Sequence, residues 1–304
     1  MDYFNYPVGL TMTKDSKWKK LFGQRRQSES ELNQETMNLA LAIQQVTEEI
    51  VLKLAATAKK LTGCKNLVLA GGVALNCVSN GKLLKSKLFD HIWIQPAAGD
   101  AGGSLGAALS VWHIVHNKDR AVILNQDSMK NSLLGPSFDH REITKMLTKF
   151  SAPYQQLDNV HDVCKQTASY LDQGCVVGWF QGKMEFGPRA LGNRSILADA
   201  RNPEMQKKLN LKIKYREGFR PFAPIILEES LYEFFDIEHV SPYMLLVAPV
   251  LESRRTKEVQ NFNHLEMYER LYHIRSDVPA ITHVDYSARI QSVNKGEHPI
   301  FGNY

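Results

Sequence analysis

Apolar residues recur every three or four positions between residues 33 and 62, which is the clearest periodic pattern in the chain. The stripe consists of Leu39, Ile43, Val46, Ile50, Leu54, Ala58 and Leu61. This spacing places the side chains on one face of an α-helix. Gly63 follows the last of them and is typical of the residue that ends a helix. We therefore predict one long amphipathic helix over this segment.

Two units of strand, glycine-rich turn and helix follow this segment. The short apolar runs 66–70 (NLVLA) and 91–95 (HIWIQ) are typical of buried strands. The first leads through GGVALN into a predicted helix over 76–86, and the second through PAAGDAGG into a helix that extends toward residue 117. Repetition of this unit predicts an α/β architecture for the first part of the chain.

Residues 117–138 are polar and weakly patterned, which predicts a domain boundary. We place the first domain at 1–125 and the second at 126–304. In the second domain we predict a helix over 161–173 that ends at Gly174, and a helix from 202 with Asn202 as its cap and Pro203 at its first position. Apolar runs predict an α+β architecture with strands at 175–180, 195–199, 222–229, 243–251 and 279–284.

Composition indicates an ordinary folded protein rather than a membrane or secreted one. No window holds 18 consecutive apolar residues, and the first ten residues lack the layout of a secretory signal. The four cysteines (Cys64, Cys77, Cys164 and Cys175) show no C-x-x-C spacing, which is typical of reduced packing residues. We therefore expect a cytoplasmic protein without a membrane partner.

Positive charge is concentrated in one segment of the chain. The net charge is +5. Residues 183–220 hold ten Lys/Arg and four Asp/Glu, a sum of +6, so the rest of the chain sums to −1. Such localisation predicts a discrete anion site and no nucleic-acid partner.

We expect the anion to bind at the segment GWFQGKMEFGPRALGNRSILADAR (178–201). Arg189 and Arg194 lie among glycine, proline, phenylalanine and leucine, and arginines partly removed from water need an anionic partner. That partner is either Glu185 or Glu217, in a structural ion pair, or a phosphate ligand, which bidentate arginines suit well. We favour the phosphate, with Lys183, Lys214, Arg216 and Arg220 enlarging the positive field.

The two glycine-rich turns of the first domain offer further candidates. Gly71 and Gly72 let a ligand approach the backbone, and Asn76 can both donate and accept, although a tight strand–helix turn would explain them equally. Asp100 follows a strand end and suits a divalent cation, with helix capping as the alternative. His113 and His116 have no carboxylate at ligand spacing, so we interpret them as structural or surface residues.

Five motifs together resemble the NodU/CmcH-type O-carbamoyltransferases, which modify nodulation factors and antibiotics. These are AGGVALNC, QPAAGDAGGSLGAAL, GWFQGKMEFGPRALGNRSILAD, REGFRPFAP and PAITHVDYSARIQSV, in family order from about residue 3 to 293. The resemblance implies an actin-like ATPase fold for the first domain and a YrdC-like fold for the second. It also implies that the second domain makes carbamoyl adenylate from carbamoyl phosphate and ATP. The first domain, with divalent iron or a similar metal, would then transfer the carbamoyl group to a hydroxyl of a small sugar-containing or antibiotic-like acceptor.

Site residues carried over by position fall into three groups. Arg189, Lys214 and Arg220 match the basic residues around carbamoyl phosphate and ATP, and Asp100 matches a metal-ligating aspartate. Gly71, Gly72 and Asn76 match the nucleotide-contacting turn. Arg194, Ser195 and Arg289 are expected in the same pocket as the basic residues.

Departures from the family pattern predict an internal portion of such an enzyme. The family's metal site also needs a His-x-x-x-His pair that the first part of this chain lacks, and its usual Asn-Thr-Ser-Phe-Asn motif does not follow the final segment. Tyr286 stands where the family usually has glycine. We expect the helix at 39–61 to lack packing partners, with its apolar stripe exposed or covered in a homodimer or by a complementing amino-terminal half.

Two other classes of function stay open. The chain could be a non-catalytic nucleotide- or anion-binding module, such as half of a split enzyme. It could also be a small-molecule kinase or ATPase of the actin-like class, which would release ADP rather than pyrophosphate.

Overall fold

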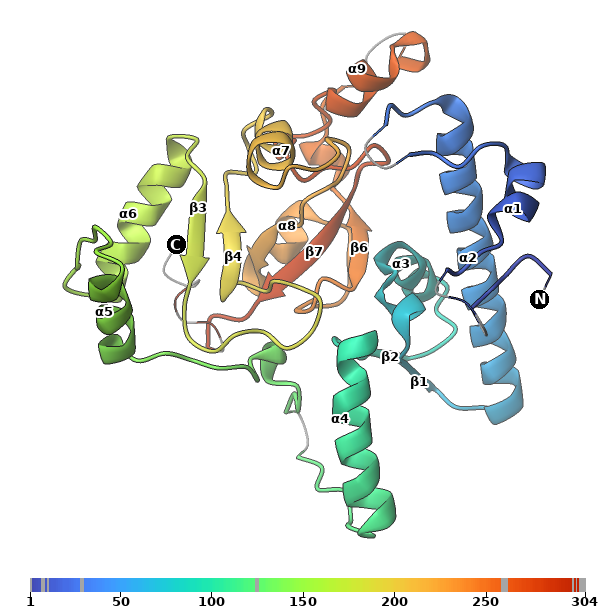
Figure 1. The fold of residues 1–304 in the computed structure, drawn as a ribbon, viewed down its shortest axis with the longest axis horizontal. Helices are drawn as coiled ribbons and strands as arrows, with labels where there is room; N and C mark the ends of the chain where they lie inside the picture. Colours follow the sequence, from blue (N-terminus) through green and yellow to red (C-terminus); the bar gives the residue numbers. More distant parts are fainter. Residues whose placement is uncertain are drawn as a thin grey trace. The chain divides into compact units, whose positions relative to one another are not determined.

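The protein has a mixed α/β architecture, seen in a computed structural model that describes residues 2–6, 9, 11–27, 30–123, 126–257, 262–296, 298 and 300 (Figure 1). The chain divides into two compact units, residues 1–49 and 50–304. The described strands form three small sheets, all of them in the second unit. Mixed α/β structure agrees with the expected fold class, whereas the boundary expected near residue 125 stays a prediction.

Aromatic contacts hold the first unit together. Helix α1 (Asp15–Phe22) places Trp18 against the ring of Phe4, at 5.7 Å between centroids. The Trp18 indole Nε1 donates to the carbonyl oxygen of Tyr3 at 2.9 Å, which ties the helix to the segment before it. No described residue of α1 is buried, so this unit has little apolar core of its own.

The long predicted helix is confirmed as α2 (Gln34–Thr62), which begins in the first unit and ends in the second. Gly63 ends it as expected, with φ +64° and its N–H donating to the Lys59 carbonyl oxygen at 2.9 Å. Most of its apolar stripe is exposed, including Ile43, Val46 and Leu54. The exposed stripe is as expected, whereas the expected lack of packing partners is wrong for the end of the helix, because Ala55 packs with Leu83 and Phe89 in a buried cluster.

The first two predicted strands pair in parallel and are joined through a helix. Strand β1 (Asn66–Leu69) lies beside β2 (His91–Ile94), with the short helix η1 (Gly72–Leu75) and α3 (Cys77–Lys85) between them in sequence. After β2 the chain forms α4 (Asp100–Ser110), which continues as the π-helical turn η2 (Val111–Val115). This is the arrangement expected from the two strand–turn–helix units.

Two further helices and an antiparallel pair of strands follow. Helices α5 (His140–Lys149) and α6 (Val160–Asp172) precede β3 (Val177–Phe180), which pairs with β4 (Arg194–Leu197). Residues 181–193 therefore form the loop of a wide hairpin. Both strands and α6 were predicted, whereas α5 was not.

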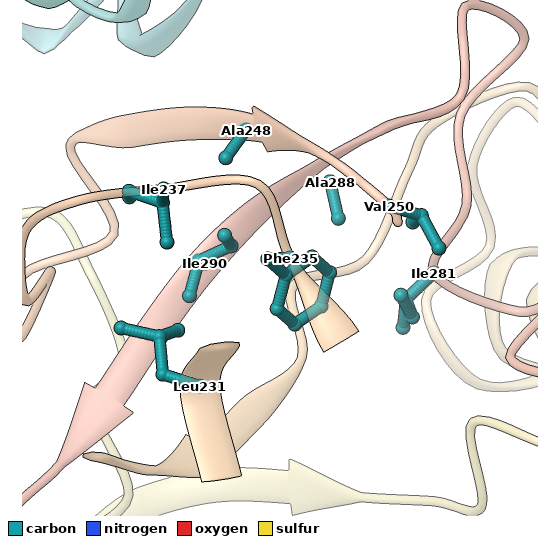
Figure 2. Packing of buried hydrophobic residues seen from close by; sticks show 8 residues of the cluster. All are labelled: Leu231, Phe235, Ile237, Ala248, Val250, Ile281, Ala288 and Ile290. Carbon is teal, nitrogen blue, oxygen red and sulfur yellow. The ribbon is translucent and has the colours of Figure 1, made fainter. Parts of the chain in front are cut away.

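The main apolar core surrounds a three-stranded sheet whose central strand is β7 (Ser287–Val293). This strand is parallel to β5 (Ile225–Leu227) and antiparallel to β6 (Leu246–Pro249). Figure 2 shows the side chains that pack against one face of this sheet. The cluster consists of Leu231, Phe235, Ile237, Ala248, Val250, Ile281, Ala288 and Ile290.

Two predicted elements of the second half are wrong in detail. The strand expected at 279–284 consists of turns, because Pro279 cannot donate to a ladder and Thr282 bonds its hydroxyl to the Val278 carbonyl; the strand follows as β7. The helix expected from Asn202 begins only at Met205 as α7 (Met205–Lys208), followed by η4 (Leu209–Ile213). Asn202 instead closes a turn, accepting from the Glu204 N–H at 3.0 Å.

Among the described residues, none of the helices combines the length and the hydropathy that a membrane span requires.

Short helical segments complete the described structure. They are η3 (Lys130–Ser132), η5 (Glu228–Ser230), α8 (Leu231–Phe234), η6 (Glu252–Arg254), η7 (Phe262–His264) and α9 (Met267–Tyr272).

Replacing two helical glycines by alanine should change the free energy of unfolding in opposite directions. Gly81 lies on α3, which packs closely on β6, whereas Gly103 lies on the exposed helix α4. A Cβ at Gly81 would lie 2.8 Å from the Val247 carbonyl oxygen, whereas one at Gly103 would meet no atom within 4 Å. We expect Gly81→Ala to lower the free energy of unfolding by about 1–3 kcal/mol through overpacking. Gly103→Ala should raise it by about 0.5–1 kcal/mol through helix propensity. Urea denaturation followed by circular dichroism measures both; equal stability of the two variants would contradict the packing.

Candidate functional site

The glycine-rich turns of the sequence motifs lie against one another in the second unit. The Gly71 N–H donates to the Ala98 carbonyl oxygen at 2.8 Å, which joins the turn after β1 to the turn after β2. Gly187 adopts φ +122° beside Ala97, where a Cβ would be 3.4 Å from the alanine Cβ. An apolar cluster that includes Ala74, Ala98 and Leu191 fills the space between the three segments.

Glu185 determines the shape of the 181–193 loop. Its side chain is buried, with 7% of its surface exposed. Its Oε1 accepts from three backbone N–H groups, those of Leu191 at 2.7 Å, Asn193 at 2.8 Å and Arg194 at 3.2 Å. The carboxylate thus organises the backbone and pairs with no arginine side chain in the described part of the chain, so the alternative of an Arg–Glu185 ion pair is wrong for the described residues.

The side chain of Arg194 also stabilises the 181–193 loop, by donating to its carbonyl oxygens. Its guanidinium donates to four carbonyl oxygens, including that of Gln181 at 2.6 Å and that of Gly182 at 3.1 Å, and its Cζ lies 3.5 Å from the centroid of the Phe180 ring. These contacts use its donors within the protein. Ser195 next to it accepts from the Gly192 N–H at 3.0 Å. Both residues support the loop in this structure.

Arg189 instead reaches out of the loop to the amino-terminal end of α3. Its Nη2 donates to the Leu75 carbonyl oxygen at 3.1 Å, 114 positions earlier in the chain. Its Nε is buried and has no hydrogen-bond partner among the described residues, and the same holds for the Nε of Arg289 on β7. No ion pair in the described part of the chain joins Arg189, Arg216 or Arg289 to a carboxylate. Buried donors without acceptors indicate a place for an anion.

Electrostatic effects show that these arginines share one environment with Cys77. Burial lowers the pKa of Arg289, and the positive charges of Arg189 and Arg216 lower it further. Burial raises the pKa of the Cys77 thiol, while Arg289 and Arg189 oppose that rise. We call Arg189, Arg216, Arg289 and the α3 residue Cys77 the arginine cluster. Its uncompensated positive charge, at the positive end of a helix, suits a phosphate.

Arg216 extends this cluster toward the segment KYREGFRPFAP. Its Nε donates to Asn210 Oδ1 at 2.7 Å, and its guanidinium lies over the ring of Phe222. Burial lowers its pKa, as does the positive charge of Arg220. Arg220 itself is exposed and pairs with Glu217 at 3.0 Å, which is the structural ion pair foreseen as an alternative. Lys214 is exposed after η4.

The remaining candidates lie on the turns that meet the cluster. Asn76 caps α3, its side chain accepting from the Ser79 N–H at 3.1 Å, and Gly72 begins η1. Asp100 is exposed in the first turn of α4, where Gly99 is the cap residue, so the capping alternative is wrong. No group of three His, Cys, Asp or Glu side chains in the described part of the chain could hold a metal ion. Asp100 therefore does not form a metal site with the described residues.

Sequence reasoning missed the place of two residues in this site. Cys77, expected as a packing residue, directly follows Asn76 at the start of a helix that leaves a glycine turn. Arg216 was counted only as part of a broad positive field. Tyr286, which stands in place of the family's glycine, adopts φ +61° just before β7, and its ring lies under Arg255 at 4.9 Å. The usual glycine at this position is explained by that left-handed backbone.

Comparison with known proteins assigns both parts of the chain to one family. Residues 1–109 match the family model described as Carbamoyltransferase N-terminus, and residues 168–303 match Carbamoyltransferase C-terminus. The uncharacterized protein sll1178 of Synechocystis sp. is 52% identical over 302 residues, which are 98% of this chain and 49% of that protein. Nodulation protein NolO of Bradyrhizobium diazoefficiens is 36% identical over 88% of this chain and 45% of its own length. Nodulation protein U of Rhizobium tropici is 32% identical over 81% of this chain and 36% of its own length.

The chain thus spans about half of the length of these relatives, or less. The matched segments include every motif that contributes to the arginine cluster, because Leu75 and Cys77 lie in the first segment and Arg189, Arg216 and Arg289 in the second.

The three hydrogen bonds to Glu185 predict that the loop depends on its charge. We expect Glu185→Gln to lower the free energy of unfolding by about 1.5–3 kcal/mol, because hydrogen bonds to a charged group become hydrogen bonds to a neutral one in a buried place. Urea denaturation measures the change. Glu229→Gln is the control, since Glu229 forms an exposed pair with Lys295 whose loss should cost about 0–1 kcal/mol. Equal costs for the two variants would remove Glu185 from its organising role.

Proposed function

Because the chain belongs to the carbamoyltransferase family, we propose that it takes part in ATP-dependent carbamoylation of a hydroxyl group, as an O-carbamoyltransferase or a portion of one. The observation that carries this proposal is the arginine cluster, in which buried guanidinium nitrogens without carboxylate partners face the start of α3. The proposed ligands of this cluster are carbamoyl phosphate and the phosphates of ATP. The proposed acceptor is a small hydroxylated molecule, and no nucleic acid takes part.

The chemistry requires positive charge at each step. Water first displaces inorganic phosphate from carbamoyl phosphate and leaves carbamate. A carbamate oxygen then attacks the α-phosphorus of ATP, which gives carbamoyl adenylate and pyrophosphate. The acceptor hydroxyl finally attacks the carbamoyl carbon, loses its proton, and AMP leaves. Guanidinium groups that are already desolvated and positioned would stabilise the negative charge that develops on the phosphate oxygens.

Each candidate residue has a proposed part in this scheme. Arg189 and Arg289 would hold phosphate oxygens directly, with Arg216 behind them. Lys214 and Arg220 would contact the ligand from the exposed side, which for Arg220 means exchanging Glu217 for phosphate. Arg194 and Ser195 would keep the loop in shape. The turn with Gly71, Gly72 and Asn76 would face the nucleotide.

The finer architecture belongs to the same proposal. We propose an actin-like ATPase fold for residues 1–125 and a YrdC-like fold for 126–304, in a cytoplasmic protein. Asp100 is the proposed ligand for a divalent metal such as iron, but the described residues do not complete a site around it. Further ligands would have to come from outside the described chain, so no step is assigned to a metal held here.

Removing an arginine of the cluster should weaken anion binding. We expect Arg289→Ala and Arg189→Ala each to weaken carbamoyl phosphate binding by about 1.5–3 kcal/mol, the worth of a hydrogen bond to a charged group. Isothermal titration calorimetry measures the affinity. Arg201→Ala is the matched control, because it removes the same charge from a side chain that pairs with Asp172 and Asp199 at the surface. Unchanged affinity in both test variants would move the anion site elsewhere.

The products formed from ATP should separate the proposed reaction from a kinase or ATPase. We expect the isolated chain, given carbamoyl phosphate and ATP, to release pyrophosphate slowly and to transfer no carbamoyl group to a panel of hydroxylated sugars. Transfer needs an oriented acceptor, and orientation accounts for about 7–11 kcal/mol of a barrier. Chromatography of the nucleotides and carbamoylated products provides the measurement. ADP as the product would favour the kinase class, and robust transfer by a monomer would contradict the dependence on further chain.

A further inference from the structure

The segment between the two family matches is tied to the loop that joins β3 and β4. We call residues 127–136 of this segment the strap. Three backbone hydrogen bonds join the strap to the loop. They are Phe186 N–H to the Ser132 carbonyl oxygen at 2.7 Å, Met184 N–H to the Pro136 carbonyl oxygen at 2.9 Å, and Gly135 N–H to the Met184 carbonyl oxygen at 2.9 Å. The bonded loop residues lie on either side of Glu185, so the strap holds the backbone from which that carboxylate projects.

The strap and the loop approach each other closely at Gly135. A Cβ at this position would lie 2.8 Å from the Met184 carbonyl oxygen and 3.0 Å from the Met184 Cβ. The nearest atom belongs to the backbone, which cannot swing aside as the end of a flexible side chain can. Glycine therefore permits this contact, and a larger residue would push the two segments apart.

Asp127 fixes the beginning of the strap to the core of the second unit. Its carboxylate accepts from the Met129 N–H at 2.9 Å, from the Asn131 N–H at 3.0 Å and from the hydroxyl of Tyr243. The ring of Tyr243 packs edge-on against Trp93 of β2, at 6.1 Å between centroids. The side chain of Met129 is buried in the apolar cluster that fills the space between the glycine-rich turns. The strap is thus anchored before it reaches the loop.

The backbone of the strap is strained between the anchor and the loop. Lys130, Asn131 and Ser132 adopt φ values of +48°, +54° and +62°, which residues other than glycine rarely adopt even singly. Ser132 is only 1% exposed, so the strained turn reaches into the interior. Strained backbone persists where the surrounding structure determines it, and it concentrates at functional sites. Here the turn brings the Ser132 carbonyl oxygen to the loop.

We propose that the strap positions the 181–193 loop, and thereby Arg189, for phosphate binding. The strap holds the backbone on both sides of Glu185, and the carboxylate of Glu185 in turn closes the part of the loop that carries Arg189. The strap acts through the loop and is assigned no contact with the ligand, so Gly135 is a positioning residue. The inference rests on the proposed function in one respect, namely that phosphate is the ligand.

A double-mutant cycle tests whether the strap acts through Arg189. We expect Gly135→Ala to weaken carbamoyl phosphate binding by about tenfold in isothermal titration calorimetry, because a displaced loop withdraws a charged donor. In the Arg189→Ala background the same substitution should change the affinity by less than about twofold, since the donor to be positioned is gone. Val250→Ala is the control for lost stability: it opens a cavity in the core around β7, and should lower resistance to urea without changing the affinity. Unchanged affinity in Gly135→Ala, or an equal loss in both backgrounds, would overturn the proposal.

Hydrogen exchange of the unchanged chain tests the hold on the loop without any variant or ligand. Mass spectrometry of peptides that cover 127–136 and 184–194 should give the same opening free energy for both, because the hydrogen bonds between them break together. Gly135→Ala should speed exchange in 184–194 by about tenfold and leave β7 unchanged. Independent opening of the two segments in the unchanged chain would overturn the proposal. Failure of the unchanged chain to bind carbamoyl phosphate would overturn the proposed ligand, whereas joint opening would still support the hold of the strap on the loop.

Discussion

The buried carboxylate of Glu185 is the constraint on which the candidate site depends. By accepting three backbone N–H groups it closes residues 185–194 into a compact turn, without which these donors would be buried and unsatisfied. The closed turn places Gly187 against Ala97 and leads Arg189 toward the carbonyl of Leu75. A single acidic side chain thereby determines where a basic one points.

The arginines fall into two groups: those with partners within the fold and those whose charge has no acidic partner among the described residues. Arg194, Arg201 and Arg220 have carbonyl or carboxylate partners, so their charge and donors are used within the fold. Arg189 and Arg289 are partly desolvated and lack such acidic partners among the described residues. Desolvated like charges repel, as the lowered pKa of Arg289 indicates, and an anion would relieve that repulsion. Because desolvation and repulsion between like charges disfavour this cluster in the free protein, its presence supports the binding of an anionic ligand.

Side-chain burial differs between two parts of the second unit. The second unit has an apolar core around β7, which lies between β5 and β6 and clusters with Leu231 of α8 and with Phe235 (Figure 2). The α4–η2 helix, by contrast, has no fully buried residue, although Leu105 packs against an apolar cluster, and Asp100 at its start is not part of a group of three possible ligands among the described residues. Both features lie on the segment after β2.

Local sequence pattern determined the elements whose formation depends on near neighbours. The stripe and the terminal glycine specified α2, and short apolar runs between turn residues specified β1 to β4, because helix and strand periodicity reflect burial within the element itself. The same reasoning failed at 279–284, where apolar residues fill a core through turns rather than through a strand. The five motifs identified the family and the basic segment, and those inferences needed no coordinates.

Only the tertiary structure decided which arginines remain available. Arg189 and Arg194 are five positions apart in one motif and have similar sequence neighbours. Arg194, at the start of β4, stacks on the ring of Phe180 and donates to four carbonyl oxygens, whereas Arg189 donates to the carbonyl oxygen of Leu75, 114 positions away. The meeting of Arg189, Arg289 and Cys77 likewise joins distant segments. An arginine's role follows from the partner that long-range packing brings to it, and no local periodicity carries that information.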